Sequence, residues 1–306
     1  MRLLTRSDFD GLACAVLLKD AGMMDEWKFV HPKDVQDGTI QVTSDDILAN
    51  VPYAKGCGMW FDHHSSEDER HHHGFEYRGL SRAAPSAARL VYEYLGGAKQ
   101  FGDRFDIMLA HVDKVDSGDL TVEEIQKPTG WVLLGFVMDP RTGLGRYRGF
   151  RISNYALMEE LIEYCRTLPI EKILELPDVR ERVALYFKQE KPFHKMLKAC
   201  SAVHGTVVVL DLRDQEEIYT GNRFLLYTLF PKCNVSIQVL WGLKNRNTVF
   251  TVGRSITNRT CTTDIGSLML KYGGGGHRQV GTCQVETERA GTVLAELIAA
   301  LREDKR

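Results

Sequence analysis

The sequence predicts an α/β fold, with a parallel sheet flanked by helices in the first half of the chain and a smaller mixed α+β domain at the end. Three observations support this prediction. Short apolar segments alternate with Ala- and Leu-rich helical segments up to about residue 150, which is typical of parallel strands with crossover helices. From about residue 205 the pattern changes to strands. At 306 residues the chain is long enough for two compact domains.

Apolar runs locate the elements of the first half. Strands are expected at residues 3–5, 47–49 and 59–61, and a helix at residues 12–18. A second helix is expected from Ala83 to Leu95, with Pro85 in its first turn and Gly96-Gly97 ending it. This alternation of strands and helices predicts the parallel sheet.

The second half divides into a helical part and a strand-rich part. Residues 151–203 are charged and helical in pattern, with prolines as breaks, and they predict a helical connector. Strands are expected at residues 206–210, 235–240 and 248–252, and helices at 264–271 and 290–302. The predicted organisation is therefore 1–150, 151–203 and 204–306.

Composition narrows the classes of function. A hydrophobic content of 43% and a charged content of 26% are typical of soluble globular proteins, and we expect neither a membrane span nor a secretory signal. The seven scattered cysteines contain no CxxC pair, which predicts reduced thiols in a cytoplasmic protein. A net charge of −2 disfavours a long nucleic-acid groove and favours short or small phosphorylated substrates.

Side chains that bind metals follow two of the predicted strands. Asp8 and Asp10 come after the first strand, and Asp62-His63-His64 follows the strand at residues 59–61. In parallel α/β sheets ligands bind beyond the carboxyl ends of the strands, so we expect these side chains to converge. Taken alone, the segment with Asp8 and Asp10 is also compatible with a solvated turn, and Asp62-His63-His64 with a hydrogen-bonded histidine pair. Together they favour a site for Mn²⁺ or Mg²⁺.

With these residues the chain resembles the DHH phosphoesterase family. The resemblance covers nearly the whole chain, and DHH followed by GGGGH is a specific combination. It implies a DHH catalytic domain at residues 1–150, a DHH-associated substrate-binding domain at 204–306, and Mn²⁺- or Mg²⁺-dependent hydrolysis of phosphodiester or phosphoanhydride bonds. The segments that support it are Asp8-Phe9-Asp10-Gly11, Asp62-His63-His64, the acidic segment at 111–119, and Gly273-Gly274-Gly275-Gly276-His277-Arg278.

The resemblance also implies roles for the residues of the first and third motifs. Asp8, Asp10 and His63 would bind one or two ions. His64 would act at the scissile phosphate, either by stabilising the transferring phosphoryl group or by protonating the leaving oxygen. Asp62 would orient the site, as carboxylates near ligating histidines commonly do.

Two motifs leave alternatives open. Asp113 and Asp116 both match the fourth motif. The second motif calls for a metal-bridging aspartate at the end of a strand, where this chain has Asn50, whereas Asp46 precedes that strand. The chain also has Arg6 where many relatives have a histidine.

The C-terminal domain is expected to bind the substrate. Consecutive glycines let backbone N–H groups point at an anion, and neighbouring cations add charge-assisted hydrogen bonds. The residues implied are Arg254, Ser255, Gly274, Gly275, Gly276, His277 and Arg278. The segment His71-His72-His73 is interpreted as an exposed loop, and residues 139–143 as a turn from which Arg141 could reach the cleft.

The favoured function is a Mn²⁺- or Mg²⁺-dependent phosphoesterase that hydrolyses short oligoribonucleotides, including short single-stranded RNA, or small phosphorylated nucleotides. The sequence leaves open whether the protein forms a homodimer. An exopolyphosphatase or pyrophosphatase is the alternative enzyme, although pyrophosphatase relatives lack the GGGGH form of the second domain. A nucleotide-binding regulatory protein with a degenerate metal centre is the alternative from another class, because Arg6 and Asn50 depart from the family pattern.

Overall fold

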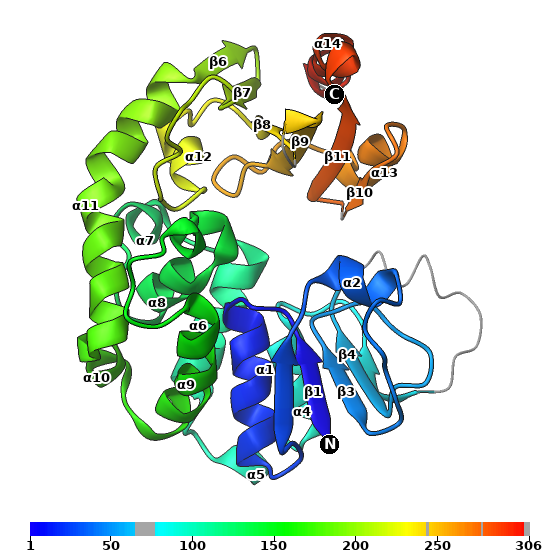
Figure 1. Ribbon diagram of the computed structural model, residues 1–306, viewed down its shortest axis with the longest axis vertical. Coiled ribbons are helices and arrows are strands. Elements are labelled where there is room, and N and C mark those ends of the chain that lie inside the picture. Colours follow the sequence, from blue (N-terminus) through cyan, green and yellow to red (C-terminus); the bar gives the residue numbers. More distant parts are fainter. Residues whose placement is uncertain (65–76, 243–244, 277, 303–306) are drawn as a thin grey trace. The chain divides into compact units, whose positions relative to one another are not determined.

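The computed structural model describes residues 1–64, 77–242, 245–276 and 278–302, and these fold into two compact units (Figure 1). The N-terminal unit comprises residues 1–119 and 127–187, and the C-terminal unit comprises residues 120–126 and 188–306. The range predicted to be a helical connector, 151–203, contains α9 (Asn154–Thr167), α10 (Ile170–Glu175) and α11 (Pro177–Ala199), and its residues up to 187 belong to the N-terminal unit.

The N-terminal unit contains a five-stranded, fully parallel sheet, which confirms the predicted fold class. The strand order is β2-β1-β3-β4-β5. The three central strands are almost fully buried, as their apolar sequences require. The two edge strands carry polar residues and were not predicted. The strands are β1 (Arg2–Thr5), β2 (Glu26–Phe29), β3 (Asp46–Ala49), β4 (Met59–Asp62) and β5 (Arg78–Ser81).

Several helices pack with this sheet in the N-terminal unit, and α1 (Phe9–Asp20) contacts four of them. It is buried from Phe9 to Leu18 and packs against β1, α4, α6, α8 and α9, so its apolar residues surround the helix instead of forming one stripe. The predicted helix at 83–95 begins later than expected, because Ser86 caps it and Pro85 precedes the cap. The other helices are α2 (Pro32–Gln36), α4 (Ala87–Tyr94), α5 (Ala98–Phe101), α6 (Asp106–Ser117) and α8 (Gly130–Met138), with the 3-10 turns η1 (Pro140–Thr142) and η2 (Leu144–Arg146).

The C-terminal unit contains a six-stranded mixed sheet in the order β10-β11-β9-β8-β7-β6, in which only the β7–β8 pair is parallel. Its core includes residues of α13 and α14 and one face of β8, β9 and β11. The strands are β6 (Ser201–His204), β7 (Val207–Asp211), β8 (Val235–Trp241), β9 (Asn247–Arg254), β10 (Gly275–Gly276) and β11 (Val280–Glu286). The helices are α7 (Val122–Gln126), α12 (Leu225–Leu229), α13 (Ile265–Leu270) and α14 (Ala290–Arg302), with η4 (Thr287–Arg289).

Among the described residues, no helix is both long and apolar enough to cross a membrane. Each of the seven cysteines is a free thiol.

Candidate metal centre

Asp10 lies in the first turn of α1, and its carboxylate is held by the start of α4. Oδ2 accepts the N–H of Ala87 at 2.9 Å and Oδ1 accepts the N–H of Ala88 at 2.8 Å. The positive end of a helix stabilises an anion in this position. Burial, together with the nearby carboxylates of Asp116 and Asp8, nevertheless raises the pKa of Asp10 well above its ordinary value. A cation between these carboxylates would favour their ionised forms.

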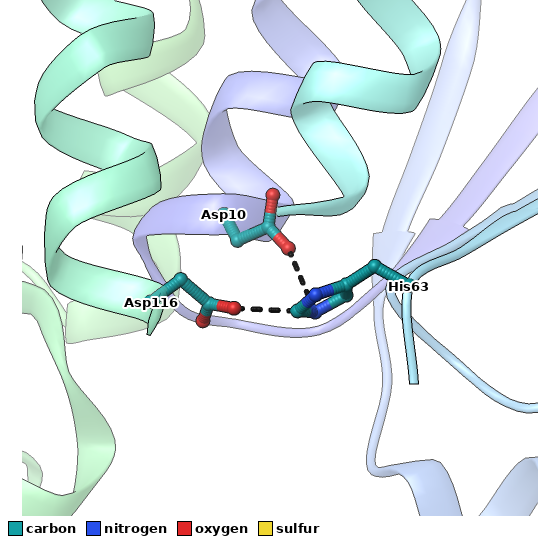
Figure 2. Close-up of side chains that lie close together, drawn as sticks. All are labelled: Asp10, His63 and Asp116. Carbon is teal, nitrogen blue, oxygen red and sulfur yellow. Dashed lines mark ion pairs between the residues drawn. The ribbon is translucent and has the colours of Figure 1, made fainter. Parts of the chain in front are cut away.

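His63 directly follows β4 and brings an imidazole nitrogen to Asp10. Its Nδ1 lies 3.2 Å from the carbonyl oxygen of Ala84, which can only accept, so this contact favours the tautomer with the proton on Nδ1. In that tautomer Nε2 presents a lone pair. Nε2 is buried without a hydrogen-bond partner in the described part of the chain, and it faces Oδ2 of Asp116 at 3.1 Å and Oδ2 of Asp10 at 3.7 Å (Figure 2). A lone pair that faces two carboxylates is the arrangement that a bound cation would satisfy.

Asp116 completes the cluster from the end of α6. The three side chains point toward one another in Figure 2, and their ligand atoms all lie within 4.8 Å of one another. Two carboxylate oxygens and one imidazole nitrogen suit a Mn²⁺ or Mg²⁺ ion. The residues present therefore fit the ion that the sequence predicted.

Asp8 is engaged differently. It is the N-cap of α1, and its Oδ1 accepts hydrogen bonds from the backbone N–H of Gly11 and from Nδ2 of Asn50, both at 3.0 Å. Its Oδ2 lies 3.1 Å from Nε of Arg6. One oxygen of Asp8 therefore accepts two hydrogen bonds and the other is in an ion pair, and the three-residue cluster does not include Asp8. Asn50 is beside Asp8 and has a left-handed backbone conformation (φ 56°), which asparagine tolerates better than most residues.

Asp46 lies at the other end of β3, and this placement corrects its interpretation as a ligand. It pairs in register with Arg2 at the start of β1, whereas the metal cluster lies beyond the carboxyl ends of the strands. Its carboxylate accepts hydrogen bonds from Nε of Arg2 at 2.7 Å and from the N–H of Thr43 at 2.7 Å. Burial by itself would raise the pKa of Asp46, but the bonds from Arg2 and Thr43 outweigh it and lower the pKa. Asp46 is thus part of a structural ion pair.

Asp113 also lies outside the cluster, although it precedes Asp116 by only three residues on α6. Its Oδ1 accepts a hydrogen bond from the hydroxyl of Ser86 at 2.7 Å. Its Oδ2 accepts hydrogen bonds from Nε and Nη2 of Arg89 at 2.9 and 2.5 Å. Ser86 is the N-cap of α4 and accepts the N–H of Arg89. Asp113 therefore stabilises the helix start that holds Asp10.

Asp62 orients both histidines of the DHH segment. It is 1% exposed, and its Oδ1 accepts the backbone N–H of His63 at 2.9 Å and lies 2.5 Å from Nδ1 of His64. Burial by itself would lower the pKa of His64, but the carboxylate of Asp62 outweighs it and raises that pKa to about 9. The ring centroids of His63 and His64 are 4.3 Å apart, so a positively charged imidazole lies beside the ring of His63 at neutral pH.

Sequence reasoning did not single out Asp139. This residue and Arg141 line a small recess in the N-terminal unit together with Asp8, Asp10 and Asp116. Residues 139–143 form a turn as expected, and Arg141, which was expected to reach the cleft, lines this recess. Nothing in the sequence marks Asp139 as its neighbour there, because that place depends on how α8 packs against α1.

In the C-terminal unit, Arg254 and Ser255 hold the loop that follows β9. Nε of Arg254 donates to the carbonyl of Thr263 at 2.9 Å, and Nη2 donates to the carbonyl of Thr262 at 2.7 Å. Ser255 is buried, and its Oγ accepts the N–H of Asn258 at 3.0 Å. Both predicted substrate-binding side chains thus have structural contacts.

The glycine run forms part of the sheet. Gly275 and Gly276 form β10, which pairs with β11. A Cβ on Gly274 would lie 2.1 Å from a backbone carbonyl of β11, and one on Gly276 would lie 2.3 Å from another, so the close approach of the chains requires glycine. The side chain of Arg278 is exposed. His277 and the segment His71-His72-His73 lie outside the described residues.

Comparison with known proteins decides the family. No family model and no curated protein matches the chain. Among solved structures, the chain is similar to the pGpG-specific phosphodiesterase PggH from Vibrio cholerae, with 49% sequence identity over 99% of both chains and a TM-score of 0.81. The chain belongs to the DHH phosphoesterase family. It is a phosphohydrolase, as the sequence predicted.

A more distantly related solved structure shares the fold. The chain is similar to RecJ from Thermus thermophilus, solved in complex with Mn²⁺, with 13% identity and a TM-score of 0.51. The similarity covers 99% of this chain and 52% of RecJ. At this identity the likeness shows the fold alone.

Proposed function

We propose that this protein hydrolyses pGpG, or an equally short phosphorylated oligoribonucleotide, with a divalent cation held by Asp10, His63 and Asp116. The observation that carries the proposal is the convergence of these three side chains around a buried Nε2 that has no hydrogen-bond partner among the described residues. The substrate class is supported by the 49% identity to a phosphodiesterase specific for pGpG, over the full length of both chains.

A cation at this position would polarise the phosphoryl group and activate water as a nucleophile. The chain holds two of the three ligands in place: two backbone N–H groups fix Asp10, and the carbonyl of Ala84 fixes the His63 ring. The imidazole donor favours Mn²⁺ over Mg²⁺, because Mg²⁺ prefers ligand sets made of oxygen.

His64 is the second functional group of the site. Asp62 holds it through Nδ1 at 2.5 Å, and this contact fixes the orientation of the ring. A charged imidazole beside the cluster can stabilise negative charge on the phosphoryl group or protonate the leaving oxygen. Asp62 acts through His64 and His63.

Two general properties agree with a small substrate in the cytoplasm. A net charge of −2 does not suit the many phosphate contacts of a long nucleic-acid groove. Free thiols at all cysteines are typical of a reducing compartment.

The test is an assay of metal-stripped protein with Mn²⁺ added back. With pGpG, hydrolysis of the single phosphodiester bond consumes one water and releases two molecules of GMP, which chromatography can count. We expect Mn²⁺-dependent cleavage of pGpG, and weaker cleavage of longer RNA and of polyphosphate. His63→Ala should abolish cleavage without changing the circular dichroism spectrum, whereas His31→Ala, at an exposed histidine outside the cluster, should not. An active His63→Ala protein, or cleavage of polyphosphate but not pGpG, would contradict the proposal.

A further inference from the structure

Arg141 lies on a rigid turn that borders the metal centre. The turn is η1, and Asp139 caps it by accepting the backbone N–H of Arg141 at 2.8 Å. The hydroxyl of Thr142 donates to the carbonyl of Phe136 at 2.6 Å and ties the turn to α8. Gly143 ends the turn with a left-handed backbone (φ 91°), which favours glycine. The backbone of Arg141 is therefore fixed on both sides.

The packing of α8 against α1 brings this turn to the cluster. A Cβ on Gly135 of α8 would lie 2.9 Å from the ring of Phe9, so the ring of Phe9 packs directly against the helix backbone. Phe9 precedes the ligand Asp10, and Asp139 follows Gly135 by four residues, just over one helical turn. All four residues line the same recess.

The side chain of Arg141 is held at one edge. Its Nε donates to both oxygens of Asp139, at 2.8 and 3.1 Å. The Asp139 side chain is only 5% exposed, whereas that of Arg141 is 43% exposed. Within the described part of the chain, the two terminal nitrogens of Arg141 donate no hydrogen bond. A guanidinium carries five N–H donors, so four remain for a ligand.

The recess combines several carboxylates with one guanidinium. Four carboxylates line it, those of Asp8, Asp10, Asp116 and Asp139, and Arg141 is the cation among its lining residues. The protein atoms packed around the guanidinium would by themselves lower the pKa of Arg141, but the carboxylates of Asp139, Asp8 and Asp116 outweigh this effect and raise the pKa. The guanidinium is thus close enough to feel the charges of the metal centre, and it stays protonated.

We propose that Arg141 binds the phosphate group that reacts at the metal centre, and that Asp139 is its positioning residue. A guanidinium offers parallel N–H donors that match two phosphate oxygens, and its charge would oppose the negative charge that builds up on the phosphoryl group. The identity of the substrate rests on the proposed function, but the phosphate contact does not, because any phosphate ester at this centre would meet the same donors.

The first experiment compares Arg141→Ala and Arg141→Lys with Arg148→Ala, a control at an exposed arginine near the turn that does not line the recess. With pGpG and Mn²⁺, kcat should fall by about 10²–10³-fold in Arg141→Ala, and by less in Arg141→Lys, which keeps the charge but not the fork of donors. Mn²⁺ affinity should not fall in any of the three variants, and an unchanged affinity would also show that the metal centre is folded. Guanidinium ion below denaturing concentration should raise kcat of Arg141→Ala alone. Unchanged kcat in Arg141→Ala would overturn the proposal.

Asp139→Asn tests the positioning role. It should lower kcat by less than Arg141→Ala does, and it should add little when combined with Arg141→Ala, because both act through one guanidinium. Independent losses that simply add would show that Asp139 acts in another way.

A binding measurement separates this proposal from the proposed function. Inorganic phosphate is titrated into the Mn²⁺-loaded wild type and Arg141→Ala proteins in a calorimeter. We expect the variant to bind phosphate at least about 10-fold more weakly, as loss of a charge-assisted contact requires. If the wild type does not cleave pGpG but this difference is seen, the substrate is wrong and the Arg141 contact is right. Equal affinities, or no binding by the wild type, would overturn the contact whatever the substrate.

Discussion

Asp116→Asn and Asp113→Asn, two substitutions three residues apart on α6, are expected to affect different properties: metal binding in the first and stability in the second. Asp116 faces His63 Nε2 at 3.1 Å, so its loss should weaken Mn²⁺ binding. Asp113 binds Ser86 and Arg89, so its loss should weaken the fold. The sequence could not separate these two aspartates, which makes the pair a sharp test of the structure.

The size of the Asp116 effect follows from its direct place in the cluster. Losing a group that only supports a metal ligand costs about 10–100-fold in affinity, so losing a ligand should cost at least about 100-fold, or about 2.7 kcal/mol of binding free energy. At a Mn²⁺ concentration of about 100 times the wild-type Kd, the ion should raise the free energy of unfolding by about 2.7 kcal/mol in the wild type and by only about 0.4 kcal/mol in the variant. Without the ion, Asp116→Asn should be as stable as the wild type or more so, because it removes a charge that opposes ionisation of Asp10.

The Asp113 effect should be present without any ion. The side chains of Asp113 and Arg89 are 15% and 28% exposed, so the value of their ion pair lies between that of surface and buried pairs. We expect Asp113→Asn to lower the free energy of unfolding by about 1–3 kcal/mol. Mn²⁺ affinity should fall by about 10-fold at most, since the change reaches Asp10 only through the start of α4.

Two measurements check both variants. Electron paramagnetic resonance measures the concentration of free Mn²⁺ during a titration. Urea unfolding with and without Mn²⁺ gives the free energy of unfolding of each variant. If Asp113→Asn loses Mn²⁺ binding while Asp116→Asn retains it, the cluster is assigned to the wrong aspartate.

Four further substitutions test other parts of the structure. Asn50→Asp should raise the number of bound Mn²⁺ ions from one to two, because it replaces the amide that donates to Asp8 by a second carboxylate; elemental analysis of the dialysed protein counts the ions, and an unchanged count would show that Asn50 does not limit it. Asp46→Asn should leave Mn²⁺ binding unchanged but lower the free energy of unfolding at pH 7 by about 1–3 kcal/mol. Because the folded protein lowers the pKa of Asp46 from 3.8, this difference should be full above pH 3.8 and disappear as the pH falls through the folded pKa, which urea titrations over a pH series would detect. Gly274→Ala should destabilise the protein by about 1–3 kcal/mol or more, because its Cβ would lie 2.1 Å from a carbonyl of β11. By contrast, Gly291→Ala in α14, with no atom within 4 Å of its Cβ, should stabilise it by about 0.5–1 kcal/mol in the same assay.

The sequence predicted the central strands because they are buried and therefore almost wholly apolar, as in Ile47-Leu48-Ala49. It did not reveal the edge strands β2 and β5, whose sequences EWKF and RGLS contain charged residues. An edge strand pairs on one side only and is partly exposed, so its residues need not be apolar. β11 was not predicted either. Its buried positions are Gly281, Cys283 and Val285, and a glycine at the first of them weakens the apolar alternation that marks a strand.

The site residues were predictable to the extent that strand ends fix them. Asp10 and His63 follow buried strands, and the structure brings them together. The choice between Asp113 and Asp116 was not predictable, because residues three apart lie on the same side of a helix and only contacts with α4 distinguish them. Asp139 was not predictable either, since its place beside the cluster depends on Gly135 packing against Phe9.

The first motif shows why a departure from the family pattern need not mean loss of function. Asp8 and Asp10 line the same recess, as the prediction that they converge requires, but they have different partners. Asp8 is the N-cap of α1, and Asp10 lies in the first turn. Oδ1 of Asp8 accepts a hydrogen bond from Nδ2 of Asn50, and Oδ2 forms an ion pair with the guanidinium of Arg6. A carboxylate at position 50 would repel Asp8 in this arrangement, whereas an amide stabilises it. Asn50 and Arg6 therefore both hold Asp8, and neither belongs to the cluster of Asp10, His63 and Asp116, so these two departures do not remove a ligand of that cluster.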